Sequence, residues 1–202
     1  NKLSVFTPNS EIILSAYKNK EFKNIINAAG LCTADGIGVI YASKILGTPI
    51  AERCSGYDIS LELIKKMPQT GATLYLFGAS PGVAEMAKAK IEAANSGINI
   101  VGYHDGYFDS AEEKNIINDI NVKKPNVLFV CLGSPKQEKW INDNLDKLDI
   151  NVAMGLGGCL DVYAGNVKRA PKVFIKLGLE WFYRLIKEPK RFFRMLALPK
   201  FM

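Results

Sequence analysis

The feature that most constrains the fold is a unit that recurs along the chain: a short apolar run, a glycine-bearing loop and an amphipathic stretch. We predict strands at 31–34, 73–77, 98–101, 126–132 and 151–154. Continuous apolar strands that alternate with helices are typical of a parallel sheet covered on both faces. The sequence therefore predicts an α/β fold with a mostly parallel sheet, in which ligands bind beyond the carboxyl ends of the strands.

Polar residues and glycines gather at those predicted strand ends. The polar ones are Asp35, Ser80, Asp105, Gln137 and Asp161. Gly78 with Ser80, and Gly133, suit loops in which the backbone approaches a phosphate. A glycine in such a loop is explained equally well by the turn alone.

The standard nucleotide and metal signatures are absent from the sequence. Gly155-x-Gly157 is followed by Leu160 where the dinucleotide fingerprint has its third glycine, and there is no P-loop. No Asp-x-Asp is present to chelate a divalent cation on a sugar diphosphate. We therefore predict no metal site and no cofactor, and expect a diphosphate to be bound by helix-start N–H groups and cationic side chains.

The cysteines and the one histidine give no sign of metal or disulfide chemistry. The cysteines are widely spaced, without a Cys-x-x-Cys pair: Cys32, Cys54, Cys131 and Cys159. This spacing argues against zinc and against a disulfide-stapled secreted fold. We predict all four as reduced core residues, two of them in strands, and His104 as a loop residue.

Two side chains at the strand ends are candidates for chemistry. Asp35 follows an apolar run and precedes Gly36. It suits either a helix N-cap or a general base that removes a proton from a sugar hydroxyl. Gln137 opens a predicted helix and, being neutral, can hold a sugar hydroxyl or a phosphate oxygen but cannot act as a base.

Further candidates are binding residues, each with an ordinary alternative. Thr7 suits a helix cap, with Pro8 at the first helical position. Thr7 and Asn9 could also hydrogen-bond a sugar, and capping is the ordinary alternative for both. Arg53 suits an anion site or a pair with Asp58. Tyr107 could offer its ring to a base, and Asp161 could accept from a ribose or uracil group. A second short helix is predicted at 22–28.

The net charge of +6 lies in one segment. Residues 172–202 contain eight basic and two acidic residues, so residues 1–171 are neutral overall. Aromatic and aliphatic side chains alternate with these cations, and Pro189 divides the segment into two predicted helices. A basic amphipathic helix of this kind is typical of a membrane interface, although packing on the domain is the alternative. No second basic stripe or motif suggests nucleic acid.

We place the boundary near residue 170, which divides an α/β domain at 1–170 from a membrane-associating helical appendage at 171–202. The apolar runs are too short to span a bilayer. Arginines of the appendage, namely Arg184, Arg191 and Arg194, could fold over the site and neutralise a leaving diphosphate. The chain begins at Asn1 and ends in a basic, apolar stretch, so we expect the natural protein to extend further.

Several spaced motifs resemble the WecG/TagA/CpsF family, glycosyltransferase family 26. They are Thr7-x-Asn9, Thr33-Ala34-Asp35-Gly36, Glu52-Arg53 with Gly56 and Asp58, Phe77-Gly78, Gly133-x-Pro135-x-Gln137-Glu138 and Gly155-x-Gly157-Gly158. The resemblance implies a Rossmann-like, metal-independent, inverting enzyme. Its expected reaction moves N-acetylmannosamine from a UDP-sugar donor to undecaprenyl-diphosphate-linked N-acetylglucosamine in β-1,4 linkage, during wall teichoic acid synthesis.

The same resemblance implies roles for particular residues. Asp35 becomes the base, Thr7, Asn9 and Gln137 shape the pocket, and Arg184 is the arginine supplied by the appendage. It also implies a peripheral location on the inner face of the plasma membrane. Alternatives are another donor such as UDP-N-acetylmannosaminuronic acid or UDP-glucose, a nucleotide-sugar-binding module without activity, a membrane scaffold, and a homo-oligomer formed through the appendage.

Overall fold

A computed structural model describes residues 2–187 of the chain. Its centre is a six-stranded sheet in the order β2-β1-β6-β5-β3-β4, and every neighbouring pair is parallel. The strands are β1 Leu3–Phe6, β2 Leu31–Cys32, β3 Thr73–Gly78, β4 Asn99–His104, β5 Val127–Cys131 and β6 Val152–Gly155. The predicted α/β fold with a parallel sheet is confirmed.

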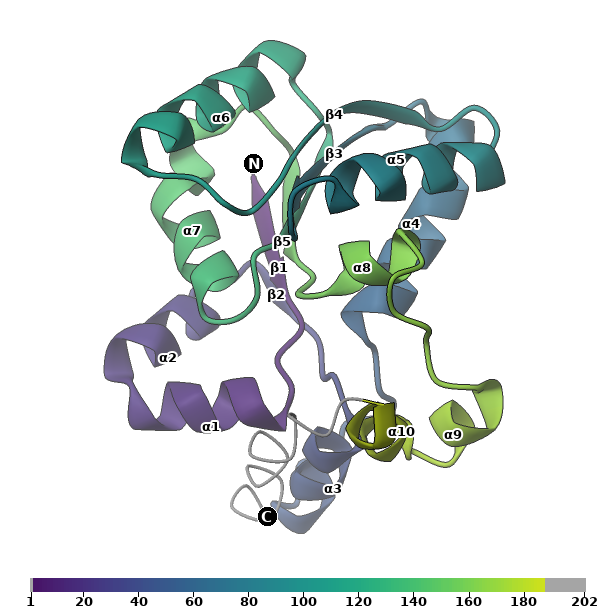
Figure 1. The fold of residues 1–202 in the computed structure, drawn as a ribbon. Helices are drawn as coiled ribbons and strands as arrows, with labels where there is room; N and C mark the ends of the chain where they lie inside the picture. The colour runs from purple at the N-terminus through teal and green to yellow at the C-terminus, as the bar shows by residue number, and fades with distance from the viewer. Residues whose placement is uncertain (1, 188–202) are drawn as a thin grey trace.

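Both faces of the sheet are covered by helices, because successive strand residues point to opposite sides. Leu74 and Leu76 of β3 pack in a cluster with α4, α5 and α8, whereas Tyr75 and Phe77 pack with α2, α6 and α7. Figure 1 shows the two helical layers on either side of the sheet. These helices are α2 Lys20–Asn27, α4 Gly56–Thr70, α5 Val83–Ala94, α6 Ser110–Lys123, α7 Lys136–Asn144 and α8 Cys159–Tyr163.

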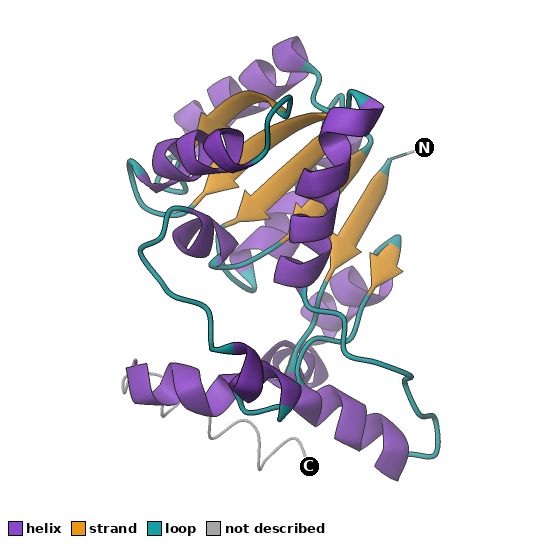
Figure 2. Ribbon diagram, turned by 90° about the vertical axis from the view of Figure 1, so that its right-hand side faces the viewer, coloured by secondary structure: helices purple, strands orange, loops and turns teal. Residues whose placement is uncertain are grey.

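The remaining helices gather mainly beyond the carboxyl ends of the strands. They are α3 Ile37–Ile45, α9 Lys172–Lys176 and α10 Glu180–Lys187, with α1 Ser10–Lys18 and a short 3-10 turn, Leu145–Lys147, elsewhere. Figure 2 shows the group formed by α3, α9 and α10 below the strand arrowheads. The edge of the sheet where ligands are expected therefore faces these helices.

The amino-terminal prediction was wrong in two respects. Helix α1 is capped by Asn9, whose Oδ1 accepts the Ile12 N–H at 3.0 Å, so the capping alternative is confirmed for Asn9. Thr7 is not the cap, and Pro8 lies outside the helix. The residues before it form β1, which the apolar-run criterion missed. Asn19 caps α2 in the same way, through the Phe22 N–H.

Three further predictions need correction. His104 is the last residue of β4 rather than a loop residue. Cys32 is exposed, because β2 is a two-residue edge strand, and among the four cysteines only Cys131 is fully buried. Within the described part of the appendage the helices are separated at Gly178, whose φ of 71° favours glycine, well before Pro189.

Candidate active site

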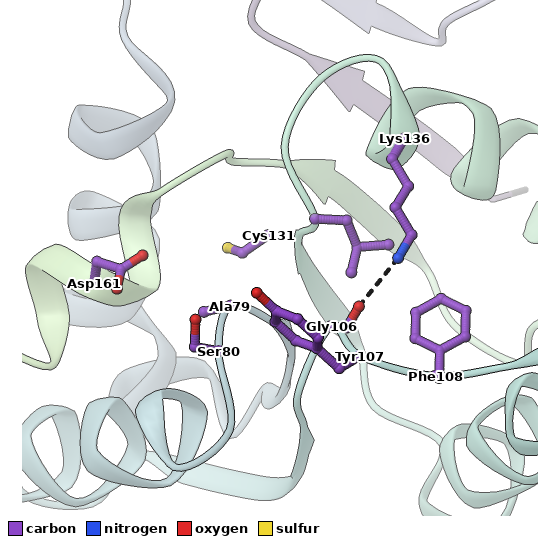
Figure 3. A pocket seen from close by; sticks show the side chains of 9 residues that line it. Ala79, Ser80, Gly106, Tyr107, Phe108, Cys131, Lys136 and Asp161 are labelled. Atoms are coloured by element: carbon purple, nitrogen blue, oxygen red, sulfur yellow. Dashed lines mark hydrogen bonds between the residues drawn. The ribbon is translucent and has the colours of Figure 1, made fainter. Parts of the chain in front are cut away.

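A pocket of about 510 Å³ lies at the carboxyl ends of β3, β4 and β5. Its walls come from three loops and from the first turn of α8, as Figure 3 shows. The lining residues are Ala79, Ser80, Gly106, Tyr107, Phe108, Cys131, Leu132, Lys136 and Asp161. Three predicted binding residues, Ser80, Tyr107 and Asp161, therefore share one cavity.

The floor of this pocket is held by backbone contacts around Gly78. A Cβ at Gly78 would lie 2.4 Å from the Cys131 carbonyl oxygen, and its φ is 125°, so only glycine fits. The next residue, Ala79, has a φ of 63° and donates its N–H to the same oxygen at 3.0 Å. Its own carbonyl accepts the Gly106 N–H at 2.8 Å, which joins the loops after β3 and β4.

Lys136 is a pocket cation that the sequence reasoning did not single out. Its Nζ donates to the Gly106 carbonyl at 3.0 Å and lies 4.3 Å from the centre of the Phe108 ring. Figure 3 shows the Lys136 contact beside Tyr107. The signal was present, since a lysine at the start of a helix that follows a strand is well placed for a phosphate.

Asp35 lies outside this pocket, in a cluster of charged side chains beyond β1 and β2. The Asp35 N–H donates to the Pro8 carbonyl at 3.2 Å, and the N-cap of α3 is Gly36. The predicted alternative of a side-chain cap at Asp35 is therefore not what the structure shows. Parallel pairing of β1 with β2, Phe6 opposite Cys32, brings Thr7 and Asn9 to the same place.

Arg53 is the centre of this cluster. Its Nη1 lies 2.9 Å from Glu180 Oε2 and 4.0 Å from Asp35 Oδ1, and its Nη2 lies 3.3 Å from Asp58 Oδ2. The predicted pair with Asp58 is confirmed, and two further carboxylates join it. The guanidinium is therefore shared among three acidic side chains.

Asp58 extends the cluster to the segment that precedes α9. Its Oδ1 accepts from Arg169 Nη2 at 2.6 Å, and Ser55 Oγ donates to its Oδ2 at 2.6 Å. Partial burial alone would raise the pKa of Asp58, but the hydrogen bonds from Ser55 and Arg169 and the charges of Arg169 and Arg53 outweigh it, so the pKa is lowered. Asp58 is thus held as a carboxylate between two arginines.

The loop after β6 lies between the pocket and the cluster. Leu156 approaches Gly56, where a Cβ would lie 3.1 Å from Leu156 Cδ2 and 2.9 Å from Thr7 Oγ1. The same loop leads into α8, which carries Asp161. Residues 155–158 therefore connect the wall that carries Asp161 with the surroundings of Thr7.

The Gln137 side chain, at the start of α7, forms a hydrogen bond with this loop. It is 4% exposed, its Oε1 accepts the Gly157 N–H at 2.8 Å, and its Nε2 donates to Glu138 Oε1 at 2.9 Å. The amide that was expected to hold a sugar or a phosphate is thus engaged with the protein. Burial raises the pKa of the neighbouring Glu138, against hydrogen bonds that lower it.

The four other predicted site residues are Gly133, Arg184, Arg191 and Arg194. Gly133 has a φ of 76° and its carbonyl accepts the Gln137 N–H, so it forms the turn into α7 and is not a pocket wall. Arg184 belongs to α10. Arg191 and Arg194 lie outside the described residues.

Comparison with known protein families identifies one that matches the whole chain. The model of the glycosyl transferase WecG/TagA/CpsF family matches residues 1–202. The chain belongs to this family. It is a glycosyltransferase, and the carboxyl edge of its sheet is where a family member with this fold is expected to bind its donor.

Curated relatives of the family cover nearly the whole chain. Two are 38% and 37% identical over 98% of this chain and 76% of their own length, from Bacillus spizizenii and Bacillus subtilis. One from Staphylococcus aureus is 37% identical over 100% of this chain and 79% of its own. All three are named N-acetylglucosaminyldiphosphoundecaprenol N-acetyl-beta-D-mannosaminyltransferase.

Within residues 2–187, no helix combines the length and the apolar character needed to cross a membrane. The same part of the chain contains no group of three or more His, Cys, Asp or Glu side chains that could hold a metal ion.

Proposed function

We propose that this protein transfers N-acetylmannosamine from UDP to undecaprenyl-diphosphate-linked N-acetylglucosamine, forming a β-1,4 linkage in wall teichoic acid synthesis. The names of the curated relatives support the acceptor and the transferred sugar. The observation that carries the proposal is the arrangement at the sheet edge. A pocket with a cation lies on one side of the loop at 155–158, and a carboxylate lies on the other.

In this proposal the pocket holds the UDP part of the donor. Tyr107 offers a ring for stacking with uracil, and Asp161 accepts from a uridine hydroxyl or ring N–H. Lys136 lines the same pocket as the Ala79–Ser80 loop and provides positive charge for the diphosphate. Further charge on the leaving UDP would be neutralised by arginines of the appendage, with Arg184, Arg191 and Arg194 as the candidates.

Asp35 is the proposed general base. It takes the proton of the acceptor 4-hydroxyl as that oxygen bonds to the anomeric carbon and the bond from this carbon to the UDP oxygen breaks. One displacement inverts the configuration, so no enzyme nucleophile is required. Thr7 and Asn9 adjoin Asp35 and are proposed to position the sugar, although Asn9 Oδ1 also caps α1.

We also propose that residues 171–202 are an appendage that meets the cytoplasmic face of the plasma membrane. Helix α3 supports this, because Ile45 and the following Leu46 are 70% and 77% exposed. Val173, Leu177, Phe182 and Ile186 of the α9–α10 segment are exposed as well. Apolar side chains at the end of the molecule that carries the site would bring the site to a lipid-linked acceptor.

The test is release of UDP from UDP-N-acetylmannosamine with a lipid-diphosphate-N-acetylglucosamine analogue and excess EDTA. Asp35→Asn should lower turnover by about 10²–10⁴-fold, the usual contribution of a general base. Asp143→Asn, a change at an exposed carboxylate on α7, is the matched control. Asp35→Asn should still bind UDP.

Each other result has a definite meaning. Full activity of Asp35→Asn would remove Asp35 as the base. Release that depends on UDP-glucose or UDP-N-acetylmannosaminuronic acid instead would reassign the donor. A wild-type protein that binds UDP but transfers none of these sugars would refute the transferase proposal. Flotation with vesicles containing anionic lipid, compared with neutral vesicles, tests the membrane contact.

A further inference from the structure

The contact between Arg53 and Glu180 joins parts of the chain that are 127 residues apart. Glu180 is the first residue of α10, and its Oε2 accepts from Arg53 Nη1 at 2.9 Å. The two side chains are only 13% and 21% exposed. A pair with this degree of burial is less screened by water and salt than one on the open surface.

A second contact places the same turn of chain beside the candidate base. A Cβ at Gly178 would lie 3.0 Å from Ile37 Cγ1, two residues after Asp35. Helices α9 and α10 are in turn joined to each other, because the Leu179 N–H donates to the Phe174 carbonyl at 2.8 Å and the Phe174 and Tyr183 rings are 5.5 Å apart. The link between the two helices therefore contacts the first turn of α3, and the two helices are joined to each other.

The Arg53 nitrogen that meets Glu180 is also the one that lies 4.0 Å from Asp35. Any change in the Glu180 contact therefore alters the position of this positive charge relative to the carboxylate. Glu180 is also one turn before Arg184 on α10. The pair thus helps to position the guanidinium, together with Asp58, and it holds that turn of the helix.

We propose that Glu180 is a positioning residue, and that its ion pair with Arg53 is the latch that holds α9 and α10 over Asp35. This assignment rests on the proposed function where it concerns turnover, since it takes Asp35 to be the base. Whether the ion pair holds α9 and α10 in place does not depend on that function and can be tested without substrate. Donor binding is expected to change little, because the pocket residues come from other loops and the arginines of the appendage are proposed to act on the charge that develops as the bond to UDP breaks.

The experiment compares Glu180→Gln with wild type and with a matched control, Glu62→Gln. Glu62 pairs with Lys65 at 2.7 Å on the exposed surface of α4, so its loss removes an ion pair that does not involve α10. Amide hydrogen exchange of residues 172–187 in the full chain should be on the order of fivefold faster in Glu180→Gln only. The turnover number should fall about tenfold, while the affinity for UDP stays within about twofold.

A double variant tests whether the two residues act through each other. Glu180→Gln should add less exchange to Arg53→Gln than it adds to wild type, since the contact between the two residues is already lost. Additive effects, or exchange at the wild-type rate in Glu180→Gln, would overturn the latch. Faster exchange with unchanged turnover would overturn the positioning role.

If the proposed function is wrong, the transfer and exchange measurements give a different combination of results. In that case wild type and Glu62→Gln would also transfer no sugar, whereas exchange of residues 172–187 would still decide the latch. Loss of UDP affinity in Glu180→Gln with no faster exchange would refute the assignment as well, because it would mean that Glu180 acts on the nucleotide directly and not through α10.

Discussion

The side-chain oxygen of Gln137 lies 2.8 Å from the backbone nitrogen of Gly157 and accepts its hydrogen bond, which ties α7 to the loop after β6. The amide also leaves little room at Gly155, where a Cβ would lie 3.0 Å from Gln137 Nε2. One buried side chain thus fixes the loop that separates the pocket from the charged cluster.

Replacing Gln137 should therefore destabilise the protein as well as the site. Gln137→Ala leaves the Gly157 N–H and a Glu138 oxygen without their partner, at a cost of about 1–3 kcal/mol in the free energy of unfolding. Urea unfolding measures this, with Gln69→Ala on the exposed side of α4 as the control. Equal midpoints for the two variants would show that the hydrogen bond does not stabilise the fold.

The close approach at Gly78 predicts a large effect from a single methyl group. Gly78→Ala would place Cβ 2.4 Å from the Cys131 oxygen, and we expect more than about 3 kcal/mol of destabilisation. Gly71 has a φ of 69° with nothing within 4 Å, so Gly71→Ala isolates the backbone cost, which is about 1–2 kcal/mol. Thermal unfolding of both variants separates the cost of the close contact from the cost of the backbone conformation. Similar losses of stability in the two variants would mean that the contact with Cys131 relaxes easily.

Lys136 should matter for the nucleotide and little for folding. Lys136→Gln removes the pocket cation, and we expect UDP to bind about tenfold more weakly because a charge-assisted contact is lost. Lys139→Gln is the control on the same helix, where the lysine lies 3.5 Å from Glu21. Titration calorimetry with UDP measures both affinities, and equal values would place the diphosphate elsewhere.

Asp58 should contribute stability that depends on pH. Its pKa is lowered in the folded protein, so the stabilisation is present above the pKa of the unfolded chain, close to 3.8. It is lost as the pH falls through the lower pKa of the folded state. The difference in unfolding free energy between wild type and Asp58→Asn should therefore be constant near neutral pH and shrink below about pH 4. A constant difference down to pH 2 would contradict the paired carboxylate.

The sheet could be predicted where each strand is apolar along its whole length. Strands β3 and β5 are buried on both faces, and the sequence shows them directly as apolar runs. Strand β1 was missed because it is short and contains Ser4, and its position depends on pairing with β2 and β6. Edge strand β2 was found, but its small size explains why the prediction that Cys32 is buried failed.

The site could be predicted as a set of residue types at strand ends, but not as a geometry. Ser80, Tyr107 and Asp161 share the pocket because parallel strands end at one edge, which is a property of the fold class. Nothing in the local pattern showed that Gln137 turns inward to Gly157, or that Glu180 meets Arg53 across the molecule. Those contacts depend on how distant segments pack.

The pocket floor consists of main chain bonded to main chain, from Ala79 to Cys131 and from Gly106 to Ala79. Substitutions that change the side chains above it, such as Ser80 or Tyr107, therefore leave that floor in place. Selectivity for the nucleotide can then be changed through the walls, while the main-chain scaffold beneath keeps its geometry. Attempts to redirect the enzyme to a donor with another nucleotide should vary the walls and preserve Gly78.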